Sequence, residues 1–229
     1  MRRLKMAWQR AAQDRLGVAS PTGDGQAEPD VEAVLKERLR RICDDGRAVW
    51  GTFEAQIRNH RFHTFVPGDY ECVLAALTAL WVKVGMEGRA PRLLELGSAT
   101  GVIAIMADLV GYEACGIEID PHLVEVARAL AARHEAPVRF ATGSYLPDGY
   151  EWEDDRGDKR LGTIGVAAPA YAELGHALDY FDVVYAYPWQ GEQEIVHDLM
   201  ARHGAANAWL LLHGGEGGVS LFRGGKPQV

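Results

Sequence analysis

An acid and two glycines stand at a point in the sequence where chemistry could occur. Residues 93–101 read LLELGSATG, so an apolar run stops at Glu95, and Gly97 and Gly101 follow with three residues between them. A dinucleotide fingerprint requires GxGxxG, and a P-loop requires GxxxxGK followed by Ser or Thr, so neither motif fits. Because the turn carries an acid and lacks a lysine that would meet phosphate, it suits a ligand with an ammonium or sulfonium group.

The elements that position this turn alternate between strands and helices from residue 92 onward. Apolar strands are expected at 92–96, 114–119, 137–142, 181–187 and 208–214, with helices at 99–111, 121–134 and 191–204. Strands that are apolar throughout and separated by helices favour a parallel sheet covered on both faces. Right-handed crossovers then predict a doubly wound α/β domain, in which ligands bind at the carboxyl ends of the strands.

Taken in this order, the motifs resemble those of the class I S-adenosylmethionine-dependent methyltransferases, which have a Rossmann-like fold. The resemblance covers about residues 90–213 and rests on the acidic turn at 95–101, GIEID at 116–120 and DVVYAYPWQGE at 182–192. It implies S-adenosyl-L-methionine as the cofactor and methyl transfer as the activity.

The resemblance also implies roles for single residues. Gly97 and Gly101 let the backbone approach the methionine part of the cofactor, and Ala99 replaces the family's frequent middle glycine. Glu118 aligns with the acid that accepts hydrogen bonds from the ribose hydroxyls, and Ile119 would lie against the adenine. The neighbouring Asp120 precedes a proline that opens a helix, so we assign it a helix-capping role.

Two positions depart from the family pattern. Ser144 stands where many members carry an Asp that binds the adenine amino group. The amine-methylating members often place a polar residue before Pro-Pro-aromatic, whereas residues 186–189 read AYPW. We therefore predict a cofactor site that consists of Glu95, Gly97, Ser98, Ala99, Thr100, Gly101, Glu118, Ile119, Ser144, Tyr145 and Ala186.

Methyl transfer from a sulfonium is an in-line displacement, so the protein chiefly supplies orientation and a water-poor pocket. An aromatic wall could favour the cationic sulfur, and a hydroxyl or acid acceptor would call for a general base. The aromatic candidates are Tyr185, Tyr187 and Trp189, and the base candidates are His213, His60, His63 and Glu192. We retain His213, Tyr187, Trp189 and Glu192 as catalytic candidates, with a turn residue as the alternative for His213. Since His60 and His63 have no further ligands nearby, no metal is predicted.

The chain divides into three expected parts. Residues 1–29 form a basic helix and a flexible linker, residues 30–88 form a helical segment, and residues 89–229 form the cofactor-binding core. Within 30–88 we expect helices at 31–42, capped by Asp30, and at 69–84, while 62–70 could roof the cofactor. Residues 146–179 are long for a connection and predict a lid-like insertion. After residue 214 the family's helix and two strands are shortened, and we expect one strand at 219–224.

Composition narrows the class of partner. The formal net charge of -8 disfavours nucleic acid, so the expected acceptor is a small molecule or a protein side chain. The three cysteines are few and far apart, and no apolar run is long enough to span a membrane, which favours a cytoplasmic protein. The shortened sheet edge leaves two alternatives open. One is a homo-oligomer formed through that edge or the N-terminal helix, and the other is a non-catalytic cofactor-binding or assembly subunit.

Overall fold

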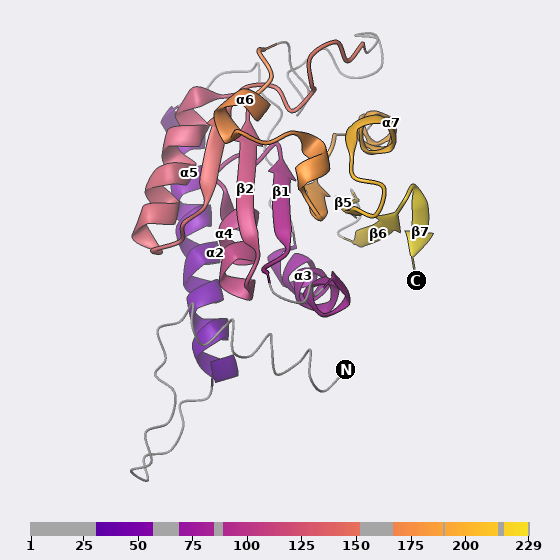
Figure 1. The fold of residues 1–229 in the computed structure, drawn as a ribbon. Coiled ribbons are helices and arrows are strands. Elements are labelled where there is room, and N and C mark those ends of the chain that lie inside the picture. The colour runs from indigo at the N-terminus through magenta and orange to yellow at the C-terminus, as the bar shows by residue number, and fades with distance from the viewer. Residues whose placement is uncertain are drawn as a thin grey trace.

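The computed structural model describes residues 31–56, 69–84, 89–151, 167–189, 191–214 and 218–228. Its centre is a seven-stranded sheet with the order β3-β2-β1-β4-β5-β6-β7, of which β2, β1, β5, β6 and β7 are labelled in Figure 1. The first five strands are parallel, and β6 and β7 are antiparallel to their neighbours. The strands are β1 (Arg92–Leu96), β2 (Glu113–Glu118), β3 (Arg139–Thr142), β4 (Val183–Ala186), β5 (Trp209–His213), β6 (Val219–Arg223) and β7 (Lys226–Gln228).

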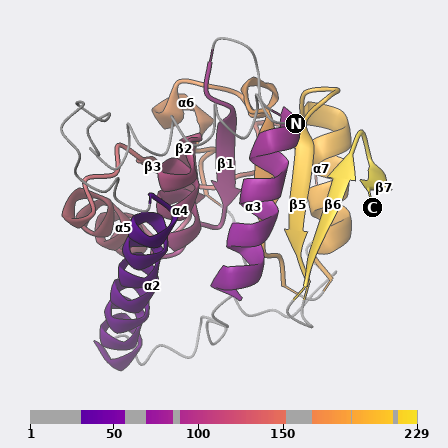
Figure 2. The ribbon, with the colours of Figure 1, turned by 90° about the horizontal axis from the view of Figure 1, so that it is seen from below.

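Helices cover both faces of the sheet, which confirms the doubly wound, Rossmann-like α/β fold (Figures 1 and 2). Successive residues of a strand point to opposite faces of the sheet. In β1, Leu93 therefore packs in the apolar cluster on one face and Leu94 in the cluster on the other face, so both faces need covering helices. One face packs against α2 (Val31–Gln56), α3 (Tyr70–Val84), α4 (Val102–Val110) and α5 (Pro121–Arg133). The other packs against α6 (Tyr171–Leu174), the 3₁₀ helix η1 (Leu178–Tyr180) and α7 (Gln193–His203). The order of the strands reverses between β1 and β4, where the ligand crevice is expected.

Helix α2 is longer than the sequence pattern predicted, since it continues past residue 42 to Gln56. Ion pairs at helical spacing join Glu37 to Arg40 and Arg41 along its exposed side. On its buried side, a Cβ at Gly46 would lie 2.3 Å from a Val102 methyl carbon, so this glycine permits close packing of α2 on α4. The predicted cap of α2, Asp30, lies outside the described residues.

The sheet ends in a hairpin where one strand was predicted. β6 pairs antiparallel with β5, with Trp209 opposite Arg223 and His213 opposite Val219. Gly224 and Gly225 both have positive φ angles, of 56° and 74°, and turn the chain into β7. Two glycines with positive φ are typical of a tight hairpin turn, so the pair at 224–225 was the signal for the second strand.

The segment 146–179 differs from the expected lid at both of its ends. Leu146, Ala170, Leu174 and Leu178 are buried in the core of the α6 and α7 face. These apolar side chains are excluded from water against the sheet, so the ends of the segment belong to the domain core. The middle of the predicted lid, residues 152–166, lies outside the described residues.

The outer edge of β3 is closed by a pair of charged side chains. Arg128 Nη2 donates to the Phe140 carbonyl at 2.7 Å, and the Thr142 backbone N–H donates to Glu173 Oε2 at 2.9 Å. The same Arg128 nitrogen lies 2.7 Å from Glu173 Oε1, which completes an ion pair across the strand edge. Side chains of α5 and α6 thus satisfy backbone groups that an edge strand would otherwise expose.

Candidate cofactor site

The turn after β1 takes a backbone shape that favours glycine at alternate positions. The φ angles of Gly97, Ala99 and Gly101 are 68°, 45° and 76°. The turn is tied to β2 by the hydrogen bond from the Ser98 N–H to the Ile117 carbonyl, at 2.9 Å. Ala99 therefore keeps the left-handed conformation that a middle glycine would adopt, at a cost on the order of 1 kcal/mol.

Glu118 joins this turn to the end of β2. Its Oε2 accepts the Ala99 N–H at 2.8 Å, and its Oε1 accepts the Asp120 N–H at 3.0 Å. Burial raises the pKa of Glu118, and hydrogen bonds from the backbone of Asp120, Ala99 and Ile119 oppose that rise. An ionised carboxylate has about four acceptor sites, so beside these backbone donors it can still accept from a ligand hydroxyl.

Asp120 caps α5 as predicted. Its Oδ1 accepts the N–H groups of His122 at 2.8 Å and Leu123 at 3.3 Å, with proline at the first helical position. The two acids of GIEID therefore have different partners. The Asp120 side chain accepts from the first turn of α5, whereas the Glu118 side chain accepts from Ala99 in the glycine turn. The capping role predicted for Asp120 agrees with these contacts, and the ligand role of Glu118 stays a prediction.

We expect Asp120→Ala to lower the free energy of unfolding by about 1 kcal/mol, the usual cost of losing a helix cap. Its backbone N–H still donates to Glu118, so affinity for S-adenosylhomocysteine should change less than twofold. Urea unfolding and calorimetry on the same preparation test this. A large loss of affinity would show that Asp120 takes part in the cofactor site.

Glu95 lies on the α3 side of β1 and is 4% exposed. Its Oε2 accepts the Ala104 N–H at 2.9 Å, so it satisfies a backbone donor in the first turn of α4. Burial raises the pKa of Glu95 well above its usual range, and the nearby charge of Glu118 raises it further. Glu95 thus fixes α4 to β1 and contributes to the wall of a cavity.

A raised pKa predicts how the stability of Glu95→Gln depends on pH. The native carboxyl favours folding below its ordinary pKa, and that contribution is lost as pH rises through the folded value. Glutamine stays neutral and can still accept from Ala104. The unfolding free energy of Glu95→Gln relative to the native chain should therefore increase from about pH 5 to about pH 9. Urea titrations at both pH values measure this difference, and a constant difference would contradict the raised pKa of Glu95.

A small cavity of about 40 Å³ opens beside the turn. Its volume is of the order of a water site and is below the several hundred Å³ of typical ligand pockets. Among the described residues, the Ser98 hydroxyl is buried without a hydrogen-bond partner and lines this space. The lining of the cavity consists of Tyr70, Glu95, Gly97, Ser98, Ala99, Thr100, Val102, Ile103, Tyr185 and Tyr187.

The lining only partly overlaps with the predicted cofactor residues. Glu95 and four residues of the turn line the cavity, whereas Gly101, Glu118, Ile119, Ala186, Ser144 and Tyr145 do not. Ser144 Oγ accepts the Leu146 N–H at 3.1 Å, and the Tyr145 carbonyl accepts the Tyr171 hydroxyl at 2.6 Å. These two residues therefore contact the 146–179 segment. Sequence reasoning missed Val102 and Ile103 as lining residues, although they directly follow the glycine turn.

The acceptor-side candidates separate into two groups. Tyr187 lines the cavity and stacks on His213, with ring centroids 4.2 Å apart and planes 19° apart. Glu192 is buried, and its Oε2 accepts the Trp189 N–H at 2.9 Å. Glu192 thus holds the turn before α7, while Tyr187 and His213 lie together next to the cavity.

Of the predicted roof at 62–70, Tyr70 lines the cavity and residues 62–68 lie outside the described part.

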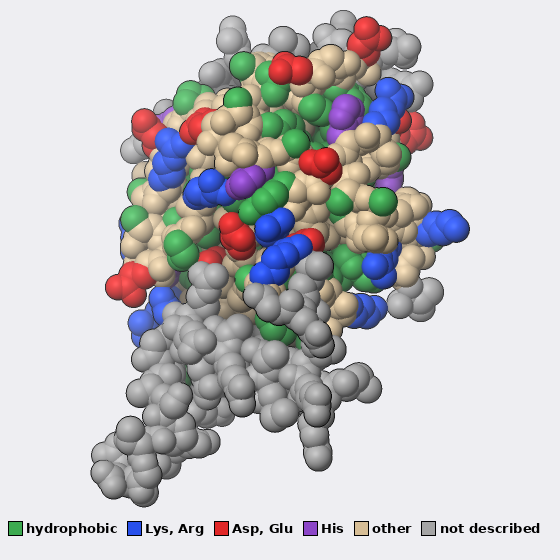
Figure 3. All heavy atoms as spheres, viewed as in Figure 1, with side chains coloured by type: hydrophobic (Ala, Val, Ile, Leu, Met, Phe, Trp, Pro, Cys, Tyr) green, Lys and Arg blue, Asp and Glu red, His purple; other side chains and the backbone are tan. Residues whose placement is uncertain are grey.

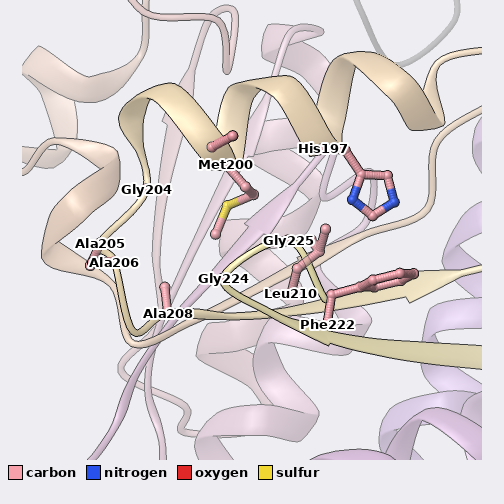
Figure 4. A pocket seen from close by; sticks show the side chains of 11 residues that line it. His197, Met200, Gly204, Ala205, Ala206, Ala208, Leu210, Phe222, Gly224 and Gly225 are labelled. Carbon is pink, nitrogen blue, oxygen red and sulfur yellow. The ribbon is translucent and has the colours of Figure 1, made fainter. Parts of the chain in front are cut away.

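A second cavity, of about 220 Å³, lies at the opposite ends of the strands. Figure 4 shows His197 and Met200 of α7 above Leu210 and Phe222 of the sheet. Ala208, which precedes β5, also lines it, so this cavity is at the amino end of that strand. It contains none of the predicted site residues.

Metal sites and membrane-spanning helices are two other features that the described residues could contain. No group of three His, Cys, Asp or Glu side chains in them is arranged to hold a metal ion. No helix among them is both long and apolar enough to cross a membrane.

The doubly wound sheet and the acidic glycine turn have the arrangement that the resemblance to class I methyltransferases implied, and a segment of the chain is similar to a methyltransferase. Over 82 residues the chain is 42% identical to ribosomal protein L11 methyltransferase of Thermus thermophilus. This match spans 35% of the chain and 30% of that protein, less than a third of its length. No family model matches the chain.

Solved structures with a similar fold include two methyltransferases in complex with S-adenosyl-L-homocysteine. The RNA methyltransferase from Salinibacter ruber is 21% identical, with a TM-score of 0.42, and the match covers 65% of this chain and 76% of that chain. The S-adenosylmethionine-dependent methyltransferase from Thiobacillus denitrificans is 21% identical, with a TM-score of 0.41, and the match covers 70% and 54%.

Proposed function

We propose that the chain is an S-adenosylmethionine-dependent methyltransferase. The observation that carries this proposal is the hydrogen bond from the Ala99 N–H to Glu118 Oε2, 2.8 Å long. It joins the glycine turn after β1 to Glu118, the acid that ends β2, next to the point where the order of the strands reverses. The 42% identity with a curated methyltransferase supports the same activity.

In this proposal each part of the site meets one part of the cofactor. The turn at 97–101 lies beside the methionine part, Glu118 accepts the ribose hydroxyls, and Ile119 contacts the adenine. The adenine contact on the β3 side comes from the backbone near Ser144, because the Ser144 hydroxyl already accepts from Leu146. Tyr185 and Tyr187 present aromatic rings toward the cavity, where a sulfonium is favoured by cation–π attraction.

Methyl transfer then depends on alignment and on exclusion of water. The sulfonium carbon is already activated, so an acceptor held in line with the carbon–sulfur bond reacts without a covalent intermediate on the protein. Tyr187, Trp189 and His213 are the groups proposed to hold the acceptor. The burial of His213 and Tyr185 supports an acceptor side that is poor in water.

We propose a protein side chain as the acceptor, with a small molecule as the alternative. The name of the Thermus relative supports a protein, although the shared segment covers 30% of that protein. Figure 3 shows positive and negative side chains interspersed on the described part of one face, without the basic stripe typical of nucleic-acid binding. The expectation against nucleic acid rests on charge alone, so RNA stays in the acceptor screen. We place the protein in the cytoplasm because Cys43, Cys72 and Cys115 are unpaired.

Calorimetry with S-adenosylhomocysteine, and with NAD as the comparison ligand, tests the proposed cofactor. We expect binding of S-adenosylhomocysteine in the micromolar range and no heat from NAD. Transfer of a labelled methyl group to protein, RNA or small-molecule fractions then tests the acceptor. Binding without transfer to any of these fractions would favour the non-catalytic cofactor-binding subunit, and binding of neither ligand would contradict both functions.

A further inference from the structure

Tyr185 and His213 form a buried pair on neighbouring strands beside the cavity. Tyr185 lies on β4 and His213 at the end of β5, and their exposed fractions are 3% and 1%. The Tyr185 hydroxyl oxygen is 3.0 Å from His213 Nδ1. Tyr187 stacks on the same imidazole, so both the plane and one edge of the ring are held.

The direction of this hydrogen bond follows from counting donors and acceptors. A phenol has one proton to donate, and a neutral imidazole has one donor nitrogen and one acceptor nitrogen. Within the described residues, His213 Nδ1 is the hydrogen-bond partner recorded for the Tyr185 hydroxyl. If Nδ1 carried the proton, the phenol hydrogen would be buried without an acceptor, at a cost of about 1–3 kcal/mol.

Both groups are also held in their neutral forms. Burial raises the pKa of Tyr185 well above its usual range, and the charge of Glu95 raises it further. Burial lowers the pKa of His213, while the charge of Asp69 at the start of α3 opposes that shift. A protonated phenol beside a neutral imidazole is the arrangement in which the hydroxyl donates to Nδ1.

We propose, on the basis of the proposed function, that Tyr185 is a positioning residue that fixes His213 as the tautomer with its proton on Nε2. His213 then meets the acceptor as a hydrogen-bond donor and not as a proton-accepting base. Such a donor suits an acceptor that presents a carbonyl, carboxylate or other oxygen next to the atom that is methylated. This assignment replaces the general-base role that the sequence suggested for His213.

The tautomer can be measured on the full chain by long-range ¹H–¹⁵N correlation of histidine side chains. The His213 signals are assigned by their loss in His213→Gln. In the native chain we expect Nδ1 in the unprotonated range and Nε2 in the protonated range. In Tyr185→Phe the two nitrogen shifts should move toward each other, since neither tautomer is then selected. Tyr187→Phe keeps the stacked ring and the Tyr185 hydroxyl, so its His213 signals should match those of the native chain.

The outcomes separate this proposal from the proposed function. A native His213 with its proton on Nδ1, or on both nitrogens, would overturn the proposal even if Tyr185→Phe did not fold. An unchanged tautomer in folded Tyr185→Phe would show that Tyr185 does not position the ring. If the expected tautomer is found but S-adenosylhomocysteine does not bind in calorimetry, the hydrogen-bond assignment holds and the methyltransferase function fails.

Discussion

Glu118→Ala is expected to lower the affinity for S-adenosylhomocysteine by on the order of 100-fold while the chain stays folded. The proposed carboxylate accepts from the ribose, and a hydrogen bond to a charged group contributes about 1.5–3 kcal/mol. Alanine also removes the acceptor of the Ala99 N–H, so the strained turn keeps only the hydrogen bond from Ser98 to Ile117 as its tie to β2. Calorimetry measures the affinity, and circular dichroism shows whether the fold is retained.

The stability of the Glu118 variants provides the control. Burial raises the pKa of Glu118, so the favourable contribution of this carboxyl exists below its ordinary pKa and is lost as pH rises through the folded value. In Glu118→Gln the gain from removing the buried charge is offset by the loss of one backbone hydrogen bond, from Ala99 or Asp120, so at neutral pH its urea midpoint should stay close to that of the native chain. Its affinity should be intermediate, because one oxygen acceptor remains. Native affinity in folded Glu118→Ala would refute the assignment of the ribose contact.

Gly101→Ala is expected to lower the free energy of unfolding by about 2–4 kcal/mol, because backbone strain and overpacking add. The φ angle of Gly101 is 76°, and an added Cβ would lie 2.5 Å from Cζ of Phe140 and 3.0 Å from Cβ of Ala127. The ring of Phe140 is 4% exposed in the core and has little room to move. Urea unfolding of the variant and of the native chain measures the change.

Gly175→Ala is the matched control for this effect. Gly175 has a φ angle of 73°, but a Cβ there would meet no atom within 4 Å. It should therefore show the backbone strain alone, about 1–2 kcal/mol. If both variants lose equal stability, the close packing of Phe140 and α5 around the glycine turn does not hold.

The parts of the fold that follow from local patterns could be predicted from the sequence. The strand 92–96 has the bounds that its apolar run indicated, and α3 begins one residue after the expected start, where Asp69 accepts the Cys72 N–H. The capping role of Asp120 followed from the proline directly after it. Each of these inferences depends on residues that lie close together in the chain.

Contacts between distant segments could not be predicted in the same way. Ser144 pairs with the segment around Pro169, 25 positions further along, and no pattern in either segment encodes that bridge. Tyr185 and His213 meet because β4 and β5 are adjacent in the sheet, and the order of strands is a property of the whole fold. The contact of Glu192 is local by contrast, because its carboxylate accepts from the Trp189 N–H three residues earlier. An acid at this spacing is a sequence signal for a capped turn.

The Arg128 and Glu173 pair at the edge of β3 has a consequence for self-association. It occupies the Phe140 carbonyl and the Thr142 N–H, the two groups through which a strand of another molecule would begin to pair. Both side chains are about half exposed, so salt and crowding act on the pair directly. Resistance to aggregation at this edge thus depends on one solvent-accessible ion pair, which a protein engineer can strengthen or remove without touching the cofactor site.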